Sequence, residues 1–402
     1  MANVVNAVVD RDSSYMSSTS RLLGRVARPI HSNFLVAATV VYVNDEDREC
    51  FTEGVNSETC VLTSCICAER AALCAIRIVP GGCRRVTDVY ITSTAEKSAL
   101  VTPGLKCREF LCEFSGAAMR VREALVREWA GDFSQRLTQT PGGGGDDDIR
   151  LILFNENRKS ITSLFKLYPH RPRFHGVPRM ALQAVGRMGS LSCTPVDAEA
   201  VLRASTASMV APPLTPAEAA AIARAYECAK SAANAPNASD DLYPVHYAAA
   251  FTMQPLAAAE VAGEVVVSRG AACLEYGCSS DAVEALMSAL VAARGSGSPP
   301  RALVQVDQWG VLAPPSAAAR AQLAELGLGA VLVALHDADG KLVLVTAGAL
   351  APSPPDIVLG RAGDESSSPR PLGASSPVPE VLTTSWAAEK CVANSRVPIF
   401  GI

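Results

Sequence analysis

The chain has 402 residues, of which 49% are hydrophobic and 19% charged, and this length and apolar content suggest two domains with a large core. Its formal net charge of −4 provides no basic field to gather phosphates, which argues against nucleic acid as the main ligand and favours a small neutral one. No apolar run is long enough to span a membrane, and residues 1–20 lack the plan of a secretory signal.

The cysteines are numerous and clustered. Of the 13 cysteines, eight lie between Cys50 and Cys112. Disulfide frameworks belong mainly to small secreted domains, and this chain is neither small nor visibly secreted. We therefore expect a reducing, cytoplasmic compartment in which some thiols bind a metal.

The first half of the chain alternates between strand and helix patterns. Residues 34–43 (FLVAATVVYV) predict a buried strand, and residues 68–78 predict a helix with a face of small alanines. Residues 86–92 predict a strand, residues 107–129 a helix with an apolar stripe, and residues 150–154 another strand. This alternation indicates a layered α/β fold.

Breaks in composition divide the chain. Residues 141–148, with the run GGGGDDD, predict a flexible surface insertion. A connector follows, and then Thr215, Pro216 and Glu218 mark the start of an alanine-rich helix over residues 216–235 as N-cap, first-turn proline and capping-box acid. The last fifty residues begin with a stretch rich in proline, serine and glycine that cannot bury much surface.

Two helix starts carry the residues suited to metal chemistry. Residues 67–70 (CAER) open one predicted helix and residues 103–109 (PGLKCRE) open another. The positive end of a helix dipole favours the thiolate that binds metals, so Cys67 and Cys107 could share a Zn²⁺ if the two starts face each other. Glu69, two residues after Cys67, could stay beside the metal and carry a proton between water and a substrate.

These motifs resemble the cytidine deaminase signature, in which His/Cys-x-Glu precedes Pro-Cys-x-x-Cys. Residues 32–38 (SNFLVAA), 56–58 (NSE), 107–114 (CREFLCEF) and 160–174 are similar to further segments of that family, in the same order over roughly 140 residues. The resemblance implies hydrolytic deamination of cytidine or deoxycytidine, a small-molecule nucleoside substrate, and a place in pyrimidine salvage.

The resemblance also assigns roles to individual residues. It implies Zn²⁺ on Cys67 and Cys107, with Glu69 as the catalytic acid and base. It further implies that Phe34 packs near the base, that Asn56 and Glu58 hold the ribose hydroxyls, and that the site is supported by Arg70, which offsets thiolate charge, and by Pro103.

The second half resembles the first with the zinc residues gone. Ser280 and Ala282 stand where Cys67 and Glu69 stand, and residues 315–320 (PSAAAR) take the place of residues 103–108 without a cysteine. An active domain followed by a degenerate copy is the plan of homodimeric cytidine deaminases. The resemblance therefore implies a homodimer and an α/β fold, in which a three-layer α-β-α cytidine deaminase-like domain precedes a degenerate copy.

The expected domain boundaries follow from these breaks and resemblances. We predict, in chain order, a catalytic domain at 1–185 with its insertion at 141–148, a linker at 186–213, a degenerate domain at 214–352, a flexible segment at 353–380 and a tail at 381–402.

One position departs from the family pattern. Gly104 follows Pro103 where the family has a cysteine, whereas catalytic zinc normally keeps three protein ligands. Three interpretations stay open. Another thiol replaces the missing ligand, with Cys65 and Cys60 nearest in sequence; water completes a weaker site; or the metal is lost and the protein is an inactive nucleoside-binding or scaffold protein.

Overall fold

The computed structural model describes residues 2–59, 65–95, 100–129, 148–171, 173–174, 177–178, 181–210, 212–235, 245–253, 265–270, 282–284, 286–287 and 299–352. The predicted insertion (apart from Asp148), the flexible segment and the tail lie outside these residues. Among the helices of the described part, none combines the length and the apolarity needed to cross a membrane.

A first sheet is built in the order β2-β1-β3-β4-β5. Its strands β3 and β4 are parallel, and the other neighbours are antiparallel. The strands are β1 (Val36–Val43), β2 (Glu49–Val55), β3 (Arg85–Ser93), β4 (Arg150–Phe154) and β5 (Lys159–Ser163). The three strands predicted for this half of the chain are therefore present, and β2 and β5 are additional.

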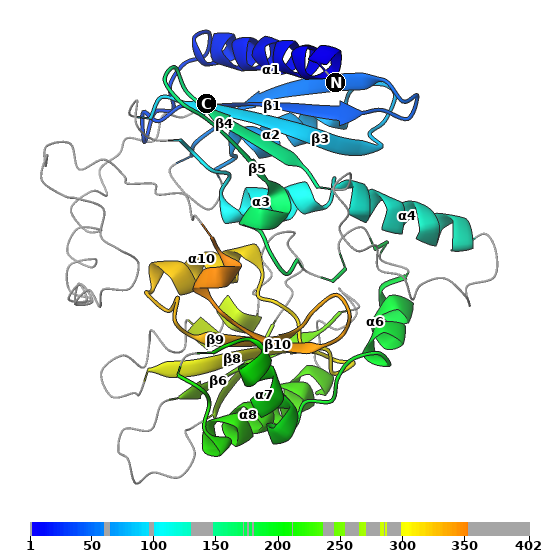
Figure 1. Ribbon diagram of the computed structural model, residues 1–402, viewed down its shortest axis with the longest axis vertical. Helices are drawn as coiled ribbons and strands as arrows, with labels where there is room; N and C mark the ends of the chain where they lie inside the picture. Colours follow the sequence, from blue (N-terminus) through cyan, green and yellow to red (C-terminus); the bar gives the residue numbers. More distant parts are fainter. Residues whose placement is uncertain are drawn as a thin grey trace, which may run out of the picture. The chain divides into compact units, whose positions relative to one another are not determined.

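Helices cover both faces of this sheet (Figure 1). Helix α1 (Ala2–Leu23) lies along one face, and α2 (Ala68–Ile76) and α3 (Leu105–Cys112) lie on the other. Successive residues of β1 point to opposite faces of the sheet: Val40 packs in the core on the α2 side, and Val41 packs beneath α1. The predicted three-layer α-β-α domain is confirmed.

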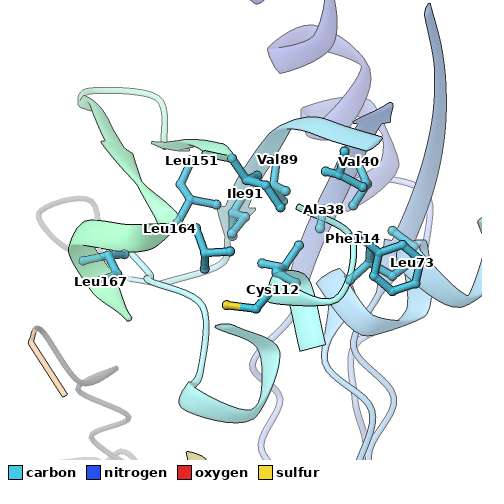
Figure 2. Packing of buried hydrophobic residues seen from close by; sticks show 14 of the residues in the cluster. Ala38, Val40, Leu73, Val89, Ile91, Cys112, Phe114, Leu151, Leu164 and Leu167 are labelled. Carbon is cyan, nitrogen blue, oxygen red and sulfur yellow. The ribbon is translucent and has the colours of Figure 1, made fainter. Parts of the chain in front are cut away.

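The core on the α2 side sets the position of the site helices. Buried side chains from α2, α3, β1, β3 and β4 meet there, including Val40, Leu73, Val89 and Cys112 (Figure 2). Helix α2 packs so close to β2 that position 54 has no room for a side chain. A Cβ added to Gly54 would lie 2.4 Å from the carbonyl oxygen of Ala68. This close approach fixes the N-terminal turn of α2 against the sheet.

A second sheet repeats the topology of the first. Its order is β10-β9-β8-β6-β7, with β8 and β9 parallel and the other neighbours antiparallel. The strands are β6 (Tyr247–Met253), β7 (Val265–Arg269), β8 (Pro300–Asp307), β9 (Leu332–His336) and β10 (Leu342–Thr346). Each strand has its counterpart in the first sheet, so the degenerate second copy is confirmed at the level of the fold.

Helices also pack on both faces of the second sheet. Helices α7 (Ala198–Ala207) and α8 (Pro216–Asn234) cover one face, and α10 (Ala317–Glu325) packs on the other. The capping box predicted for α8 is present, with the Thr215 hydroxyl accepting from the Glu218 N–H at 3.2 Å. We call the two sheets with their helices the first and second domains; both lie within the compact unit Met1–Arg361.

Two segments differ from expectation. Residues 107–129 form two helices, α3 and α4 (Gly116–Trp129), rather than one, because the carbonyl of Phe114 leaves the helix to accept the N–H of Val86 at 2.9 Å. The segment predicted as a linker contains α7 and the end of α6 (Leu182–Ser190), and Asp197 caps α7. The domain boundaries themselves stay predictions.

Candidate functional site

Two thiols and one carboxylate meet where α2 and α3 begin. Cys67 is the N-cap residue of α2, Glu69 lies in its first turn, and Cys107 lies in the first turn of α3. The two sulfurs and a carboxylate oxygen of Glu69 all lie within 4.8 Å of one another, and Glu69 and Cys107 are buried. One Zn²⁺, with Zn–S bonds of about 2.3 Å, can reach this set of donors.

The electrostatics of the three groups are linked. A hydrogen bond from the Cys107 thiol, aided by Arg70, lowers the pKa of Cys67 to about 6. The same bond and burial raise the pKa of Cys107 well above its usual value. Burial and the Cys67 thiolate raise the pKa of Glu69 to about 7. A divalent cation among them would favour the ionised form of all three groups, so the donor set fits zinc.

Arg70 lies beside the thiol of Cys67. Its Nη2 donates to the carbonyl oxygen of Cys65 at 2.7 Å and lies 3.8 Å from the sulfur of Cys67. The buried Nε–H of Arg70 has no hydrogen-bond partner within the described residues, which agrees with a site that has one thiolate fewer than its arginine can serve.

The third protein ligand is not supplied by a neighbouring cysteine in the described chain. The sulfur of Cys65 lies instead against the backbone of Thr59, 3.4 Å from its nitrogen, and it does not join the group of three donors. Cys60 lies outside the described residues. Within those residues, the carboxylate of Glu69 is the donor that accompanies the two thiols.

Gly104 occupies the N-cap of α3 without needing to be glycine. Its φ of −60° and ψ of 156° suit any L-residue, and a Cβ added there would meet nothing within 4 Å. The preceding Pro103 is buried, and its carbonyl oxygen accepts from Arg108 Nε at 2.8 Å. The departure from the family pattern is therefore a missing side chain on a backbone that could carry one.

The predicted substrate residues form a second group. The amide of Asn56 bridges the strand start, with Oδ1 accepting from the Val36 N–H at 2.7 Å and Nδ2 donating to the Phe34 carbonyl at 2.8 Å. Phe34 is half-buried against the core. The carboxylate of Glu58 accepts the N–H and hydroxyl of Ser32 at 2.9 and 2.6 Å.

A short β-bridge connects this group to the metal donors. Ser57 and Ile66 exchange backbone hydrogen bonds of 2.8 and 2.9 Å. Asn56 and Glu58 flank Ser57, and Cys67 follows Ile66, so the two groups are held next to each other along the backbone. No spacing rule identified Ser32 as the partner of Glu58, although Ser32 belongs to the segment that resembles the family.

Comparisons with known proteins agree with this geometry. Residues 10–122 match the family model described as the cytidine and deoxycytidylate deaminase zinc-binding region. The match confirms, for this part of the chain, the resemblance to the cytidine deaminase family that the motifs indicated. It also confirms Zn²⁺ as the metal that the family model and the Cys-Glu-Cys group specify.

Solved structures of cytidine deaminases are similar to part of the chain. The enzyme from Burkholderia pseudomallei has 18% identity and a TM-score of 0.28, covering 40% of this chain and 97% of its own. The enzyme from Mycobacterium tuberculosis has 19% identity and a TM-score of 0.25, covering 40% of this chain and 94% of its own. No curated protein matches the chain.

Proposed function

We propose that the first domain catalyses the hydrolytic deamination of cytidine or deoxycytidine, in which water replaces the 4-amino group and ammonia leaves. The meeting of two cysteine thiols and a buried carboxylate at the N-termini of α2 and α3 carries this proposal. The family model over residues 10–122 supports it.

The two cysteines and Glu69 have different roles in the proposed reaction. Cys67 and Cys107 would hold Zn²⁺ through their sulfurs, and bound zinc makes a water molecule more acidic. Glu69 would take a proton from the water that attacks C4 of cytosine and deliver it to N3. It would then pass the proton of the new C4 hydroxyl to the amino group, so that the C4–N bond breaks and ammonia leaves. Without metal, burial and the Cys67 thiolate raise the pKa of Glu69 to about 7. Bound zinc would lower this pKa and keep the carboxylate ionised, so that it can accept the proton.

The second group of residues would bind the nucleoside. Glu58 accepts two hydrogen bonds from Ser32, and a carboxylate has about four lone-pair positions, so it can also accept a ribose hydroxyl. Asn56 fixes the backbone of Phe34, whose half-buried ring offers an apolar surface to a base.

Zinc content and ammonia release test the proposal together. We expect protein supplied with zinc to retain the metal after dialysis and to release ammonia from cytidine or deoxycytidine, with adenosine as the unreactive control. A folded preparation that takes up no zinc and releases no ammonia from either nucleoside would contradict it.

A second candidate function is that of a nucleoside-binding or scaffold protein without turnover. Gly104 favours it, since two thiols and a carboxylate that must also move protons fall short of the usual three zinc ligands. Cytidine binding by calorimetry without ammonia release would support this function. Turnover at ordinary rates of about 1 s⁻¹ or more would exclude it.

Assembly and location are further predictions. The homodimer and the place in pyrimidine salvage are supported by the resemblance to the family, and the cytoplasmic location is inferred from the abundant cysteines of a chain that is not visibly secreted. Gel filtration with light scattering tests the first of these directly.

A further inference from the structure

Two buried arginines occupy equivalent places in the two domains. Arg108 on α3 and Arg320 on α10 are 0% and 1% exposed. Each lies five residues after a proline whose carbonyl oxygen it binds through Nε, Pro103 at 2.8 Å and Pro315 at 2.9 Å. A buried guanidinium needs acceptors for its donors, so its further bonds determine what it holds together.

Those further bonds cross between the domains. Nη1 of Arg108 donates to the carbonyl oxygens of Leu167 in its own domain and of Pro352 in the second, each at 2.7 Å. Nη1 of the second arginine donates to Leu350 in its own domain at 2.9 Å and to Pro169 in the first at 2.8 Å. Residues 167–169 and 350–352 are both Leu-x-Pro segments. Each arginine therefore binds the leucine of its own domain's segment and the proline of the other domain's segment.

A carboxylate on the zinc-site helix joins the same contact. Oε1 of Glu109, two residues after Cys107, accepts the hydroxyl of Tyr168 at 2.9 Å and the N–H of Ala317 at 3.2 Å. Ala317 is the first residue of α10, and the guanidinium of Arg320 lies 4.1 Å from the centre of the Tyr168 ring. Helix α3 thus meets the second domain through two successive residues, Arg108 and Glu109.

We propose that the second domain positions the metal site of the first, with Arg320 and Glu109 as positioning residues that hold α3 in register for Cys107. This inference rests on the proposed function in that it takes Cys107 as a zinc ligand. We call the two arginines, Glu109 and the carbonyl oxygens they share the arginine clamp. A domain that has lost its own zinc residues then still contributes to the chemistry of its neighbour.

The clamp holds the N-terminal turn of α3, which carries the proposed zinc ligand Cys107. Arg108 ties the carbonyl of Pro103 to Pro352, so the backbone just before Gly104 is anchored to the second domain. Because position 104 has no cysteine, the first turn of α3 brings one sulfur, that of Cys107, to the group of donors. Supporting bonds orient metal ligands, and their loss weakens metal binding.

The test compares paired variants of the full chain. Arg320→Met removes the hydrogen bond from the second domain to Pro169. Glu109→Ala removes the acceptor shared by Tyr168 and Ala317, and Glu109→Gln keeps an oxygen for these two donors. We expect Arg320→Met and Glu109→Ala to lower zinc affinity by about 10- to 100-fold and to alter the cobalt–thiolate charge-transfer band of Co²⁺-loaded protein. In Glu109→Gln, the zinc affinity and the cobalt–thiolate band should match those of the unmodified protein.

Hydrogen exchange provides a readout that needs no metal. In Arg320→Met and Glu109→Ala, the amides of α3 should exchange faster, while those of α8 should not. Arg301→Met, which removes an ion pair with Glu218 in the second domain, serves as the matched arginine control and should leave α3 and the cobalt spectrum unchanged.

The outcomes separate this inference from the proposed function. If the folded Arg320→Met and Glu109→Ala proteins keep normal α3 exchange and normal metal affinity, the positioning role is wrong. If Arg320→Met does not fold, the contrast between Glu109→Ala and Glu109→Gln decides in the same way. If the unmodified chain binds no zinc, the proposed function fails, and accelerated α3 exchange alone still shows that the clamp holds the helix.

Discussion

Glu69 is buried and its carboxylate lies beside the two sulfurs, within 4.8 Å, which suits a group that carries protons at the metal site. We expect Glu69→Gln to lower ammonia release by about 10²- to 10⁴-fold, because the amide cannot accept and return a proton. Zinc content should stay unchanged, since both thiols remain.

A matched control for this substitution is Glu325→Gln, which changes an exposed carboxylate at the end of α10. It should leave both activity and zinc content as they are. Loss of zinc together with activity in Glu69→Gln would mean that the carboxylate is a metal ligand rather than a proton carrier.

Gly104 allows the missing ligand to be restored. The backbone there suits cysteine and the space is open, so Gly104→Cys should place a third thiol at the start of α3 without distorting it. The gain in zinc binding should be about 3 kcal/mol, a quarter of the roughly 12 kcal/mol that four-ligand zinc sites provide. Competition against a coloured chelator measures it, with Gly104→Ser as a control of similar size. Equal affinity in the cysteine and serine variants would show that position 104 does not face the metal.

At the scale of elements, α1 is held to the sheet by buried charges. Asp12 accepts from Arg150 Nη2 and from the Tyr90 hydroxyl, each at 2.7 Å, and lies 3.0 Å from Lys159 Nζ. Burial alone would raise the pKa of Asp12, but these hydrogen bonds outweigh it and lower the pKa to about 2. Helix α1 is therefore bound more strongly when this carboxyl is ionised.

The sign of the pH dependence follows from that lowered pKa. The stability that Asp12 contributes is present above its ordinary pKa of 3.8 and is lost as the pH falls towards 2. We expect urea unfolding to show a loss of about 2 kcal/mol between pH 4 and pH 2 that Asp12→Asn does not share. The exposed control Asp339→Asn should keep the full loss. A variant at Asp12 with the same pH profile as the unmodified protein would contradict the assignment.

Elements whose signals are local were predictable, and those decided by distant partners were not. An apolar run predicts strand β1, and the spacing of alanines predicts helix α2. Helix α1 gave no such signal, because its buried side includes Asp12 and Thr19, whose partners Arg150 and Thr39 lie elsewhere in the chain. The break after α3 depends likewise on a bond between Phe114 and Val86.

The site shows the same division. The motifs around Cys67 and Cys107 predicted that two helix starts would meet, and the structure brings their sulfurs together. The partners of Glu109 could not be predicted, because Tyr168 and Ala317 lie 59 and 208 residues further along the chain. Two repeated patterns mark the clamp in hindsight: the Leu-x-Pro segments that end at Pro169 and Pro352, and the segments 103–108 and 315–320, which each begin with proline and end with arginine.

At the scale of the whole molecule, the two domains share apolar surface as well as hydrogen bonds. Ala317 and Ala351 belong to the second domain in sequence, yet both are buried in the hydrophobic cluster of the first domain. Separating the domains would expose this surface and remove from each buried arginine the acceptor that the other domain supplies. The two domains should therefore unfold as one cooperative unit.

This cooperativity can be tested by destabilising one domain and observing the other. Leu151→Ala, at a fully buried position of β4, should cost about 2–5 kcal/mol. In a urea series followed by hydrogen exchange, the midpoints for β3 and for β8 should fall together, because neither domain keeps its buried contacts alone. Leu335→Ala on β9, also fully buried, is the reciprocal variant and should lower both midpoints in the same way. A shift of β3 without β8 in the first variant would show that the domains unfold independently, and the second domain could then support α3 only through the clamp.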